Sequence, residues 1–331
     1  MSGKKLTASV AICTCNGEKF IADQIKSILK QTIKPDQIVV SDDCSTDNTI
    51  EIVKSVLSES GIDYEININS PRLGITKNFD KSFTLCKGDI LFPSDQDNVW
   101  DPEYIETFVV FFQENPSMLL AYCNGYVTDS DLNKIKVTYS DEQMNIYDKD
   151  LFLRNAVNKF FFPHGHTIAF RREFALKCIP SGFYYDEWLT MCAAAEKSVG
   201  TINKKLISFR RHSSAASAAE GGGKRKSVLS ILRNKTFDEF FVWPGYQSKA
   251  YERYLQLYEK HLSDDIRFEI SEHMAFEAEI DSLRELGLIK REKKLYRLFT
   301  KESYKKYRGN RNTYILDALY LLIKTRFSHS T

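Results

Sequence analysis

Two hydrophobic periods alternate along the first hundred residues of the chain. Continuous or alternating apolar runs at 8–15, 37–43 and 64–69 (ASVAICTC, QIVVSDD and YEININ) are typical of strands. Between the first two runs, apolar residues recur at helical spacing through 18–31, and a further short strand is predicted at 89–92 (DILF). This alternation predicts an α/β fold whose mostly parallel sheet is covered by helices on both faces.

The rest of the chain divides by pattern into a second set of strands and a helical end. Apolar runs at 118–129, 166–172 and 201–212 predict strands, and the small, glycine-rich stretch SSAASAAEGGGKRKS is typical of a linker. After the linker the hydrophobic spacing is helical. The expected domains are a first domain over 1–212 with halves at 1–100 and 101–212, a linker over 213–235 and a helical, basic region over 236–331.

Composition narrows the class of protein. The 331 residues are 43% hydrophobic and 27% charged, which is ordinary for a soluble globular chain. Seven scattered cysteines without a C-x-x-C pair favour reduced thiols over a disulfide framework or a zinc site. No run approaches the roughly 20 apolar residues that a membrane span needs. A cytoplasmic protein is therefore expected.

Charge is unevenly distributed along the chain. The net charge is only +2, yet residues 290–326 hold twelve Lys/Arg against three Asp/Glu, interleaved with tyrosines. A basic, aromatic helix of this kind can lie on an anionic membrane surface, and it can equally be a solvated face packed on the rest of the protein. No nucleic-acid-binding motif accompanies the charges, so a nucleic-acid partner is not expected.

Polar clusters follow three of the predicted parallel strands. They are Thr14-Cys15-Asn16-Gly17, Asp42-Asp43 and Asp95-Gln96-Asp97, and ligands of open α/β sheets bind where the carboxyl ends of strands meet. The third cluster lies in GDILFPSDQDNVW, which contains no Lys or Arg to neutralise its two carboxylates. Burying such a pair uncompensated is costly, so a hard cation such as Mg²⁺ or Mn²⁺ is expected at Asp95 and Asp97.

Asp42 has two interpretations. At the end of a strand its carboxylate could accept a hydrogen bond from a ribose or a base. The surrounding SDDCSTDNT is also rich in turn formers, so Asp42 could instead hold its own loop together. Both alternatives stay open from the residues alone.

Four stretches of the first hundred residues resemble the successive motifs of family 2 glycosyltransferases, inverting enzymes with a GT-A fold. They are SVAICTCNGEKFIADQIKSILKQT, IVVSDDCSTDNT, NSPRLGITKNFDKSF and GDILFPSDQDNVW. The last is most similar to the rhamnosyltransferases of bacterial O-antigen and capsule assembly, whose motif commonly reads S-D-Q-D-D-x-W. Here Asn98 departs from that motif, which lowers the local negative charge while leaving the D-x-D pair.

The resemblance implies a role for each matching residue. It makes 1–100 the nucleotide-sugar half and 101–212 the acceptor half of a catalytic domain. It implies Asp97 and Asp95 as metal ligands, joined by His212 of the fainter match ISFRRH. The nucleotide-sugar site implied by the resemblance comprises Thr14, Cys15, Asn16 and Glu18 (largely through backbone), Asp42, Arg72, Gly74, Asp95 and Arg211.

A catalytic base is expected in YYDEWL. An inverting transfer needs a carboxylate to take the proton of the acceptor hydroxyl, and this motif offers Asp186 and Glu187 between aromatic residues that would raise a carboxyl pKa. The residues leave the choice open, and the resemblance places the catalytic aspartate at Asp186. Both acids would also suit a helix N-terminus.

The resemblance implies a metal-dependent, inverting hexosyltransferase. Its expected donor is dTDP-linked L-rhamnose, with a UDP-hexose such as UDP-galactose or UDP-glucose as the alternative. Its expected acceptor is a hydroxyl of a growing glycan on a polyprenyl diphosphate, which would make docking at the inner membrane face useful. A non-catalytic scaffold of the same shape is the remaining alternative. Sugar-nucleotide synthesis is disfavoured, because the first loop, CTCNGEKF, lacks the glycine-rich, Arg-containing phosphate loop that such enzymes carry.

Overall fold

The structure is a computed structural model that describes residues 5–146, 148–157, 161–182, 184–212, 244–286 and 288–300. Contacts within the chain form two compact units, 1–156 with 161–221 and 157–160 with 222–331. The predicted linker lies outside the described residues, and so does the basic tail beyond Thr300 with its tyrosines.

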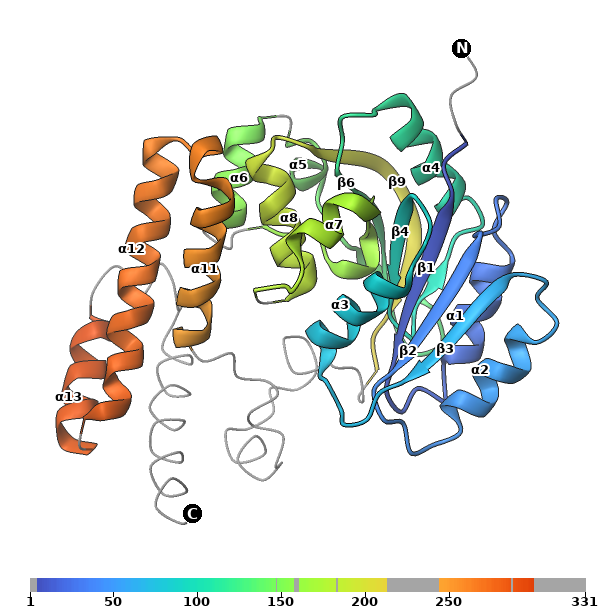
Figure 1. The fold of residues 1–331 in the computed structure, drawn as a ribbon, viewed down its shortest axis with the longest axis horizontal. Helices are drawn as coiled ribbons and strands as arrows, with labels where there is room; N and C mark the ends of the chain where they lie inside the picture. The colour runs from blue at the N-terminus through green and yellow to red at the C-terminus, as the bar shows by residue number, and fades with distance from the viewer. Residues whose placement is uncertain are drawn as a thin grey trace. The chain divides into compact units, whose positions relative to one another are not determined.

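The N-terminal half of the first unit is a parallel sheet in the strand order β3-β2-β1-β4 (Figure 1). Each predicted strand is present, with ends that differ by one or two residues. The elements are β1 (Ala8–Thr14), α1 (Ile21–Leu29), β2 (Gln37–Asp42), α2 (Thr49–Leu57), β3 (Asp63–Ile68), α3 (Ile75–Leu85) and β4 (Ile90–Ser94).

The order of these strands places helices on both faces, as the sequence predicts. From β1 to β2 to β3 the chain moves toward one edge of the sheet through α1 and α2, and from β3 to β4 it returns past both strands through α3. Because such connections are right-handed, α3 lies on the face opposite to α1 and α2. On β1, Val10 and Ile12 belong to the apolar core that contains α1 and α2. The next side chain, Cys13, instead approaches Ser82 of α3, with 3.8 Å between Sγ and Oγ.

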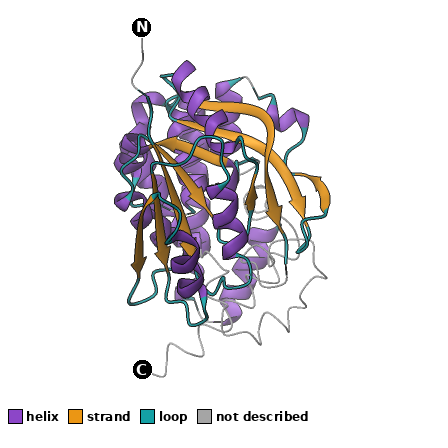
Figure 2. Ribbon diagram, turned by 90° about the vertical axis from the view of Figure 1, so that its right-hand side faces the viewer, coloured by secondary structure: helices purple, strands orange, loops and turns teal. Residues whose placement is uncertain are grey.

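The second half of the sheet is mixed, and its strands curl away from the parallel half (Figure 2). β8 lies antiparallel to both β4 and β6, whereas β9 runs parallel to β6 and ends beside it. β5 pairs with β9 and β7 pairs with β6, both antiparallel. The strands are β5 (Val99–Trp100), β6 (Leu120–Thr128), β7 (Lys134–Val137), β8 (Ile168–Arg171) and β9 (Val199–Arg210).

The strand predicted at 166–172 is shorter than expected. Gly165–Thr167 forms a single 3₁₀ turn (η1), closed by a 2.8 Å hydrogen bond from Thr167 N to His164 O, and helix α7 starts at Arg172. His164 and His166 therefore lie on a turn in front of the strand.

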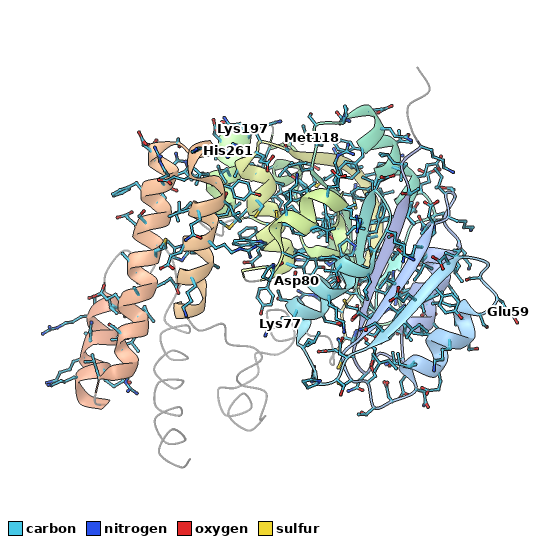
Figure 3. The ribbon with its side chains drawn as sticks, viewed as in Figure 1. Glu59, Lys77, Asp80, Met118, Lys197 and His261 are labelled. Atoms are coloured by element: carbon cyan, nitrogen blue, oxygen red, sulfur yellow. The ribbon has the colours of Figure 1, made fainter. Side chains whose placement is uncertain are left out.

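Helices of the second half pack against the sheet and against α3. They are α4 (Tyr104–Glu114), α5 (Asp141–Met144), α6 (Lys149–Val157), α7 (Arg172–Cys178) and α8 (Tyr185–Ala195). Asp80 of α3, labelled in Figure 3, accepts hydrogen bonds of 2.7 Å from both N and Oγ of Ser181. This contact fixes the turn that leads into α8 against α3, and α8 carries the predicted catalytic carboxylate.

The second unit is helical where the structure describes it. Its elements are α11 (Pro244–Tyr258), η3 (Glu259–His261), α12 (Asp264–Asp281), η4 (Ser282–Glu285) and α13 (Leu288–Phe299). Phe276, Ile280 and Leu283 are buried, in agreement with the helical hydrophobic spacing predicted for the residues after the linker. None of the described helices is long and apolar enough to cross a membrane.

Candidate active site

The candidate site lies at one edge of the first unit, where β1, β2 and β4 end. Thr14, Asp42 and Ser94 are the last residues of these parallel strands, so the three predicted polar clusters emerge side by side. β9 ends at Arg210 and pairs with β5, the short strand that follows the third cluster. The sheet therefore brings His212 to the same edge from more than a hundred residues away.

Asp42 is fully buried and is held by its own loop. Its Oδ1 accepts hydrogen bonds from Thr14 Oγ1 (2.7 Å) and Ser45 Oγ (2.5 Å), and its Oδ2 accepts one from Ser45 N (2.8 Å). Of the two interpretations of Asp42 from the sequence, these hydrogen bonds correspond to the one in which Asp42 holds its own loop together. A contact from Asp42 to a base stays a prediction.

Asp43, which sequence reasoning did not select, organises the segment that contains two predicted site residues. Its carboxylate accepts from Leu73 N (2.7 Å) and Gly74 N (2.8 Å) and lies 3.5 Å from Arg72 Nε. Gly74 has φ +82°, a conformation that a glycine adopts without strain, and starts α3 from there. The half-exposed Arg72 guanidinium is thereby held beside the β2 edge.

The loop after β1 is bound to its neighbours through nearly every polar group. The backbone N–H groups of Cys15, Asn16 and Glu18 donate to Gln96 Oε1 (2.9 Å), Ser45 Oγ (2.8 Å) and Asp47 Oδ2 (3.1 Å). Side chains of the loop also bond to the segment before α2, with Asn16 Oδ1 accepting from Thr46 N and Glu18 Oε2 from Asn48. These backbone N–H groups are therefore engaged within the protein, and a backbone contact of this loop with a nucleotide stays a prediction.

Asp95, the first carboxylate of the D-x-D pair, is partly exposed and is repelled by neighbouring acids. Asp95 has a side chain 38% exposed, and burial on its protein side, with Asp97 and Asp186 adding repulsion, raises its pKa to about 7. Asn98, where the resembling family often has an acid, is buried and places its Nδ2 3.4 Å from Asp95 Oδ2. Asn98 Oδ1 accepts a hydrogen bond from Arg210 N (3.3 Å), and an aspartate at this position could accept the same bond. An ionised aspartate could not donate to Asp95, however, as the amide of Asn98 does.

Asp97 and His212 form the closest pair of predicted ligands. Asp97 Oδ2 and His212 Nε2 lie 3.0 Å apart, and only 13% and 9% of the two side chains are exposed. The His212 ring also packs 4.4 Å from the ring of Phe20, the residue that precedes α1. A carboxylate and an imidazole are therefore fixed against each other at the edge of the sheet.

Asp186 lies in the first turn of α8, the helix N-terminus for which both acids of this motif are suited, and its role as the base stays a prediction. Its Oδ2 accepts from Gly165 N (2.8 Å) and its Oδ1 from Glu187 N (3.0 Å), and each oxygen keeps capacity for a further hydrogen bond. Burial raises the pKa of Asp186, against the opposing effect of His164 and of these donors. Asp186 also raises the pKa of Asp95, so the two carboxylates belong to one electrostatic site.

His166 also lies beside Asp95 of the candidate site. Its ring is 5% exposed, stacks on Phe209 with 4.3 Å between centroids, and places Nδ1 4.0 Å from Asp95 Oδ2. Its Nε2 has no hydrogen-bond partner among the described residues. Burial, and secondarily His164, lowers the pKa of His166 well below its usual value, so the ring is neutral beside Asp95.

The two arginines at the end of β9 differ in their surroundings. Arg210 is 3% exposed, stacks over Phe20 and pairs with Asp23 Oδ2 at 3.1 Å, so it fixes α1 to β9. Arg211, the predicted phosphate contact, donates its backbone N–H to Thr128 O (2.9 Å). Burial lowers the pKa of His164, Asp186 opposes that shift, and the charge of Arg211 adds to it. Arg211 therefore acts on the same neighbourhood as Asp186.

Comparison with known proteins identifies the family. The model of the family described as "Glycosyl transferase family 2" matches residues 9–178, which include the first four strands and both D-x-D carboxylates. That match covers more than half of the chain. The chain belongs to glycosyl transferase family 2.

Individual relatives agree with this membership. An uncharacterized glycosyltransferase of Nostoc, alr2836, is 24% identical over 252 residues, 73% of this chain and 78% of that one. The poly(ribitol-phosphate) β-N-acetylglucosaminyltransferase TarS of Staphylococcus aureus is 29% identical over 115 residues, 34% of this chain and 20% of TarS. A nucleotide-sugar-dependent glycosyltransferase is the activity that this membership supports.

Solved structures show the same fold. TarS 1–349 in complex with UDP-GlcNAc has a TM-score of 0.56 at 15% identity, covering 97% of this chain and 92% of that one. The mannosyltransferase PcManGT of Pyrobaculum calidifontis, solved with GDP-Man and Mn²⁺, has a TM-score of 0.51 at 16% identity, covering 97% and 88%. The α/β, GT-A expectation is confirmed, whereas the rhamnosyltransferase branch is not tested by these likenesses.

The donor set of this family 2 chain fits a divalent cation. Within the described ranges no three His, Cys, Asp or Glu side chains converge closely enough to form a complete protein cage. Mg²⁺ and Mn²⁺ at a phosphate need only one or two protein ligands, because substrate and water complete the shell. The Asp97–His212 pair, with Asp95 repelled by its neighbours, supplies that number of ligands.

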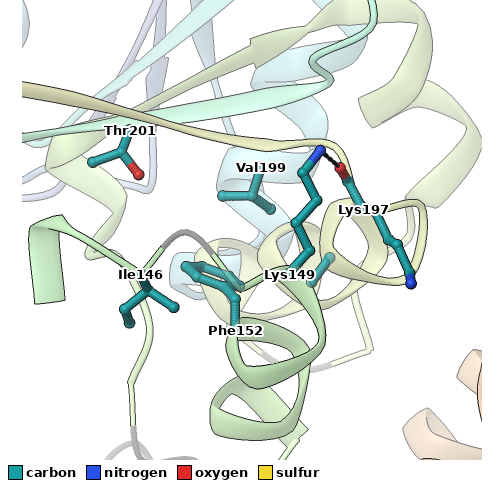
Figure 4. Close-up of a pocket in the computed structure, with 7 residues that line it drawn as sticks. Ile146, Lys149, Phe152, Lys197, Val199 and Thr201 are labelled. Carbon is teal, nitrogen blue, oxygen red and sulfur yellow. Dashed lines mark hydrogen bonds between the residues drawn. The ribbon is translucent and has the colours of Figure 1, made fainter.

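A pocket in the first unit lies at the other end of β9 (Figure 4). Lys149, Phe152 and Val199 are among its lining residues, and the Lys149 ammonium donates to the carbonyl of Lys197. Its volume of about 10 Å³ admits one water molecule at most. A sugar nucleotide cannot bind there, so the candidate site remains the sheet edge.

Proposed function

We propose that this family 2 glycosyltransferase performs a metal-assisted, inverting transfer of a hexose from a nucleoside diphosphate to a glycan hydroxyl. The observation that carries the proposal is the meeting of Asp95, Asp97, Asp186 and His212 at one strand edge. Three carboxylates gathered at one edge repel one another and favour a cation that arrives with phosphates.

Asp97 and His212 would hold the metal, with Asp95 beside them. When bound, a divalent cation would neutralise the charge that develops on the departing diphosphate. Cys15, Asn16, Glu18, Arg72 and Gly74 are proposed to line the nucleotide end. The buried Thr14 and Asp42, together with Asp43, would hold these loops in place through their hydrogen bonds. Arg211 is proposed to face the phosphates.

Asp186 is proposed as the base. Its carboxylate would accept the proton of the acceptor hydroxyl while that oxygen bonds to the anomeric carbon and the bond from carbon to diphosphate oxygen breaks. A raised pKa makes Asp186 a stronger proton acceptor than an ordinary aspartate. Gly165 N and Glu187 N hold its oxygens, so the base is oriented before the acceptor binds.

The proposal also names a donor and an acceptor for the transfer. The S-D-Q-D stretch supports dTDP-L-rhamnose, whereas the names of TarS and its UDP-GlcNAc complex support a UDP-hexose as the alternative. The acceptor is proposed to be a glycan on a polyprenyl diphosphate at the inner membrane face. The basic residues of α13, including Lys290 and Lys293, and those that follow would contact the anionic surface there.

A thermal-shift panel tests this function. Thermal unfolding of the full chain would be measured with dTDP, UDP and GDP, each with Mn²⁺ and with EDTA. Since a ligand that binds only the native state raises the melting temperature, we expect stabilisation by dTDP or UDP that is larger with Mn²⁺. Stabilisation by GDP alone would refute the donor class, and indifference to Mn²⁺ would refute the metal role of Asp97.

A further inference from the structure

The residue between the two carboxylates of the D-x-D pair makes an unusual contact. Gln96 forms two hydrogen bonds to the backbone of one residue of the β1 loop. Its Oε1 accepts from Cys15 N (2.9 Å) and its Nε2 donates to Cys15 O (3.1 Å). The side-chain amide therefore pairs with the backbone as a neighbouring strand would, and it joins the metal loop to the nucleotide loop.

Gly17 is shaped to this contact. A Cβ atom added at Gly17 would lie 2.2 Å from Gln96 Oε1 and 2.5 Å from its Cδ. Gly17 is not among the residues with positive φ, so its backbone conformation is open to other residues. The side chain that Gly17 lacks is thus excluded by the Gln96 amide and not by the backbone.

We propose that Gln96 is a positioning residue that fixes the D-x-D carboxylates relative to the nucleotide loop, and that Gly17 is required because it leaves room for the Gln96 amide. The inference rests on the proposed function, since it concerns the same metal and nucleotide site. Asp95 and Asp97 flank Gln96 in the chain, so any movement of its backbone moves both carboxylates.

Two substitutions should break this contact in different ways. Gln96→Met keeps the length of the side chain and removes both hydrogen bonds. Gly17→Ala leaves Gln96 intact but pushes its flexible end away from Cys15. If the contact positions the carboxylates, the two changes have the same consequence, and combining them adds little.

The measured quantity is the gain in nucleotide affinity that Mn²⁺ provides. Isothermal titration of the full chain with dTDP and with UDP gives the ratio of Kd in EDTA to Kd in Mn²⁺. We expect either substitution to lower that ratio about tenfold, as expected from two lost hydrogen bonds, while Kd in EDTA changes about twofold. The double variant should resemble each single variant.

Gln31→Ala is the matched control. Gln31 is a buried glutamine that also bonds to the backbone of a separate segment, with Nε2 2.7 Å from Asp101 O and Oε1 2.9 Å from Ile105 N. Its loss should lower the melting temperature and leave the Mn²⁺ ratio unchanged, which separates positioning from general destabilisation.

Three results would overturn the inference. If the wild type binds nucleotide in a Mn²⁺-dependent way but neither Gln96→Met nor Gly17→Ala changes the ratio of Kd in EDTA to Kd in Mn²⁺, the positioning role of Gln96 is refuted. The proposed function is not affected by that result. Effects that multiply to about a hundredfold in the double variant would show that the two residues act separately. A wild-type chain indifferent to both nucleotides and Mn²⁺ would refute the proposed function and this role together.

Discussion

Aspartates at two strand ends on the same edge of the sheet have opposite surroundings. Asp42 and Asp43, at the end of β2, accept hydrogen bonds from backbone and hydroxyl groups at 2.5 to 2.8 Å. Asp95, after β4, has the 3.4 Å contact with Asn98, and burial, with added repulsion from Asp97 and Asp186, raises its pKa to about 7. At the same sheet edge, the carboxylates of Asp42 and Asp43 are thus stabilised by hydrogen-bond donors, whereas the carboxylate of Asp95 is repelled by other carboxylates.

This difference distinguishes aspartates that stabilise the fold from aspartates suited to metal binding or catalysis. A carboxylate whose oxygens are occupied by protein donors stabilises its loop and has little capacity for a ligand. A carboxylate that repels its neighbours is stabilised by a cation or a proton, which is what metal binding and base catalysis require. The comparison predicts that substitutions after β2 lower stability first, whereas substitutions at Asp95, Asp97 and Asp186 lower activity first.

The largest effect is expected for Asp186→Asn. The amide keeps the size of the side chain but cannot take the acceptor proton, so kcat should fall about 10²- to 10⁴-fold. Donor binding, measured as the thermal shift with nucleotide and Mn²⁺, should persist. Release of the nucleoside diphosphate with a lipid-linked acceptor would give the rate.

Glu187→Gln is the matched control for the base, because Glu187 is the neighbouring acid in the same motif. We expect it to retain most of the activity. A larger loss for Glu187→Gln than for Asp186→Asn would reverse the assignment, and full activity in both variants would favour the non-catalytic scaffold.

The next effect is on stability, at Asp42. Asp42→Ala leaves Thr14 Oγ1 and the Ser45 N–H without their buried acceptor, so we expect a loss of about 2–4 kcal/mol in the free energy of unfolding. Urea denaturation measures it. Glu51→Ala, an exposed acid on the adjacent α2, should change little. A stable Asp42→Ala chain that loses only nucleotide affinity would restore Asp42 as a ligand.

A smaller effect is expected when the Asp97–His212 pair is broken. Asp97→Asn or His212→Gln should raise the Kd for nucleotide in Mn²⁺ about tenfold to a hundredfold and leave the Kd in EDTA nearly unchanged. Asp23→Asn, which breaks the exposed side of the Arg210 ion pair, serves as the control. Equal losses with and without Mn²⁺ would mean that the pair has a structural role only.

The strands of the first half could be predicted from the sequence because hydrophobic periodicity is a local property of the chain. Each buried parallel strand of the first half is a continuous apolar run, such as that around Val39, and each helix has a regular apolar face, so periodicity alone predicts them. The turn at Gly165–Thr167 was missed because its apolar neighbours extend the strand pattern of Ile168. The hydrogen bond that closes the turn has no signal in the periodicity.

For the candidate site, the sequence indicated residue types but not the hydrogen-bond partners of those residues. The placement of Asp95 and Asp97 after an apolar run indicates a ligand site, and the structure places His212 against Asp97 through the pairing of β5 with β9. The partners of Asp43 and Gln96 were not predicted, since their hydrogen bonds join loops 30 and 81 residues apart. Such contacts follow from strand order, which periodicity does not specify.

The smallest predicted effect is a pH-dependent stability difference at Asp95. Its folded pKa of about 7 exceeds the ordinary value of 3.8, so between those pH values the native state holds a proton that the unfolded chain has lost. Stability from this group is therefore lost as the pH rises from about 4 to about 7 and stays low above that. Asp95→Asn removes this dependence, because the amide does not titrate.

Melting temperatures of wild type and Asp95→Asn in EDTA, from pH 4 to pH 8, test this linkage. The two should coincide near pH 4, and the variant should be more stable at pH 8. Because the Asp95 side chain is 38% exposed and solvent screens part of the repulsion, we expect about 1 kcal/mol, or roughly 2–4 °C. A parallel difference at all pH values would show that Asp95 is an ordinary carboxylate. Mn²⁺ with nucleotide should reverse the order at pH 8, since only wild type offers that cation the Asp95 carboxylate beside the proposed ligands Asp97 and His212.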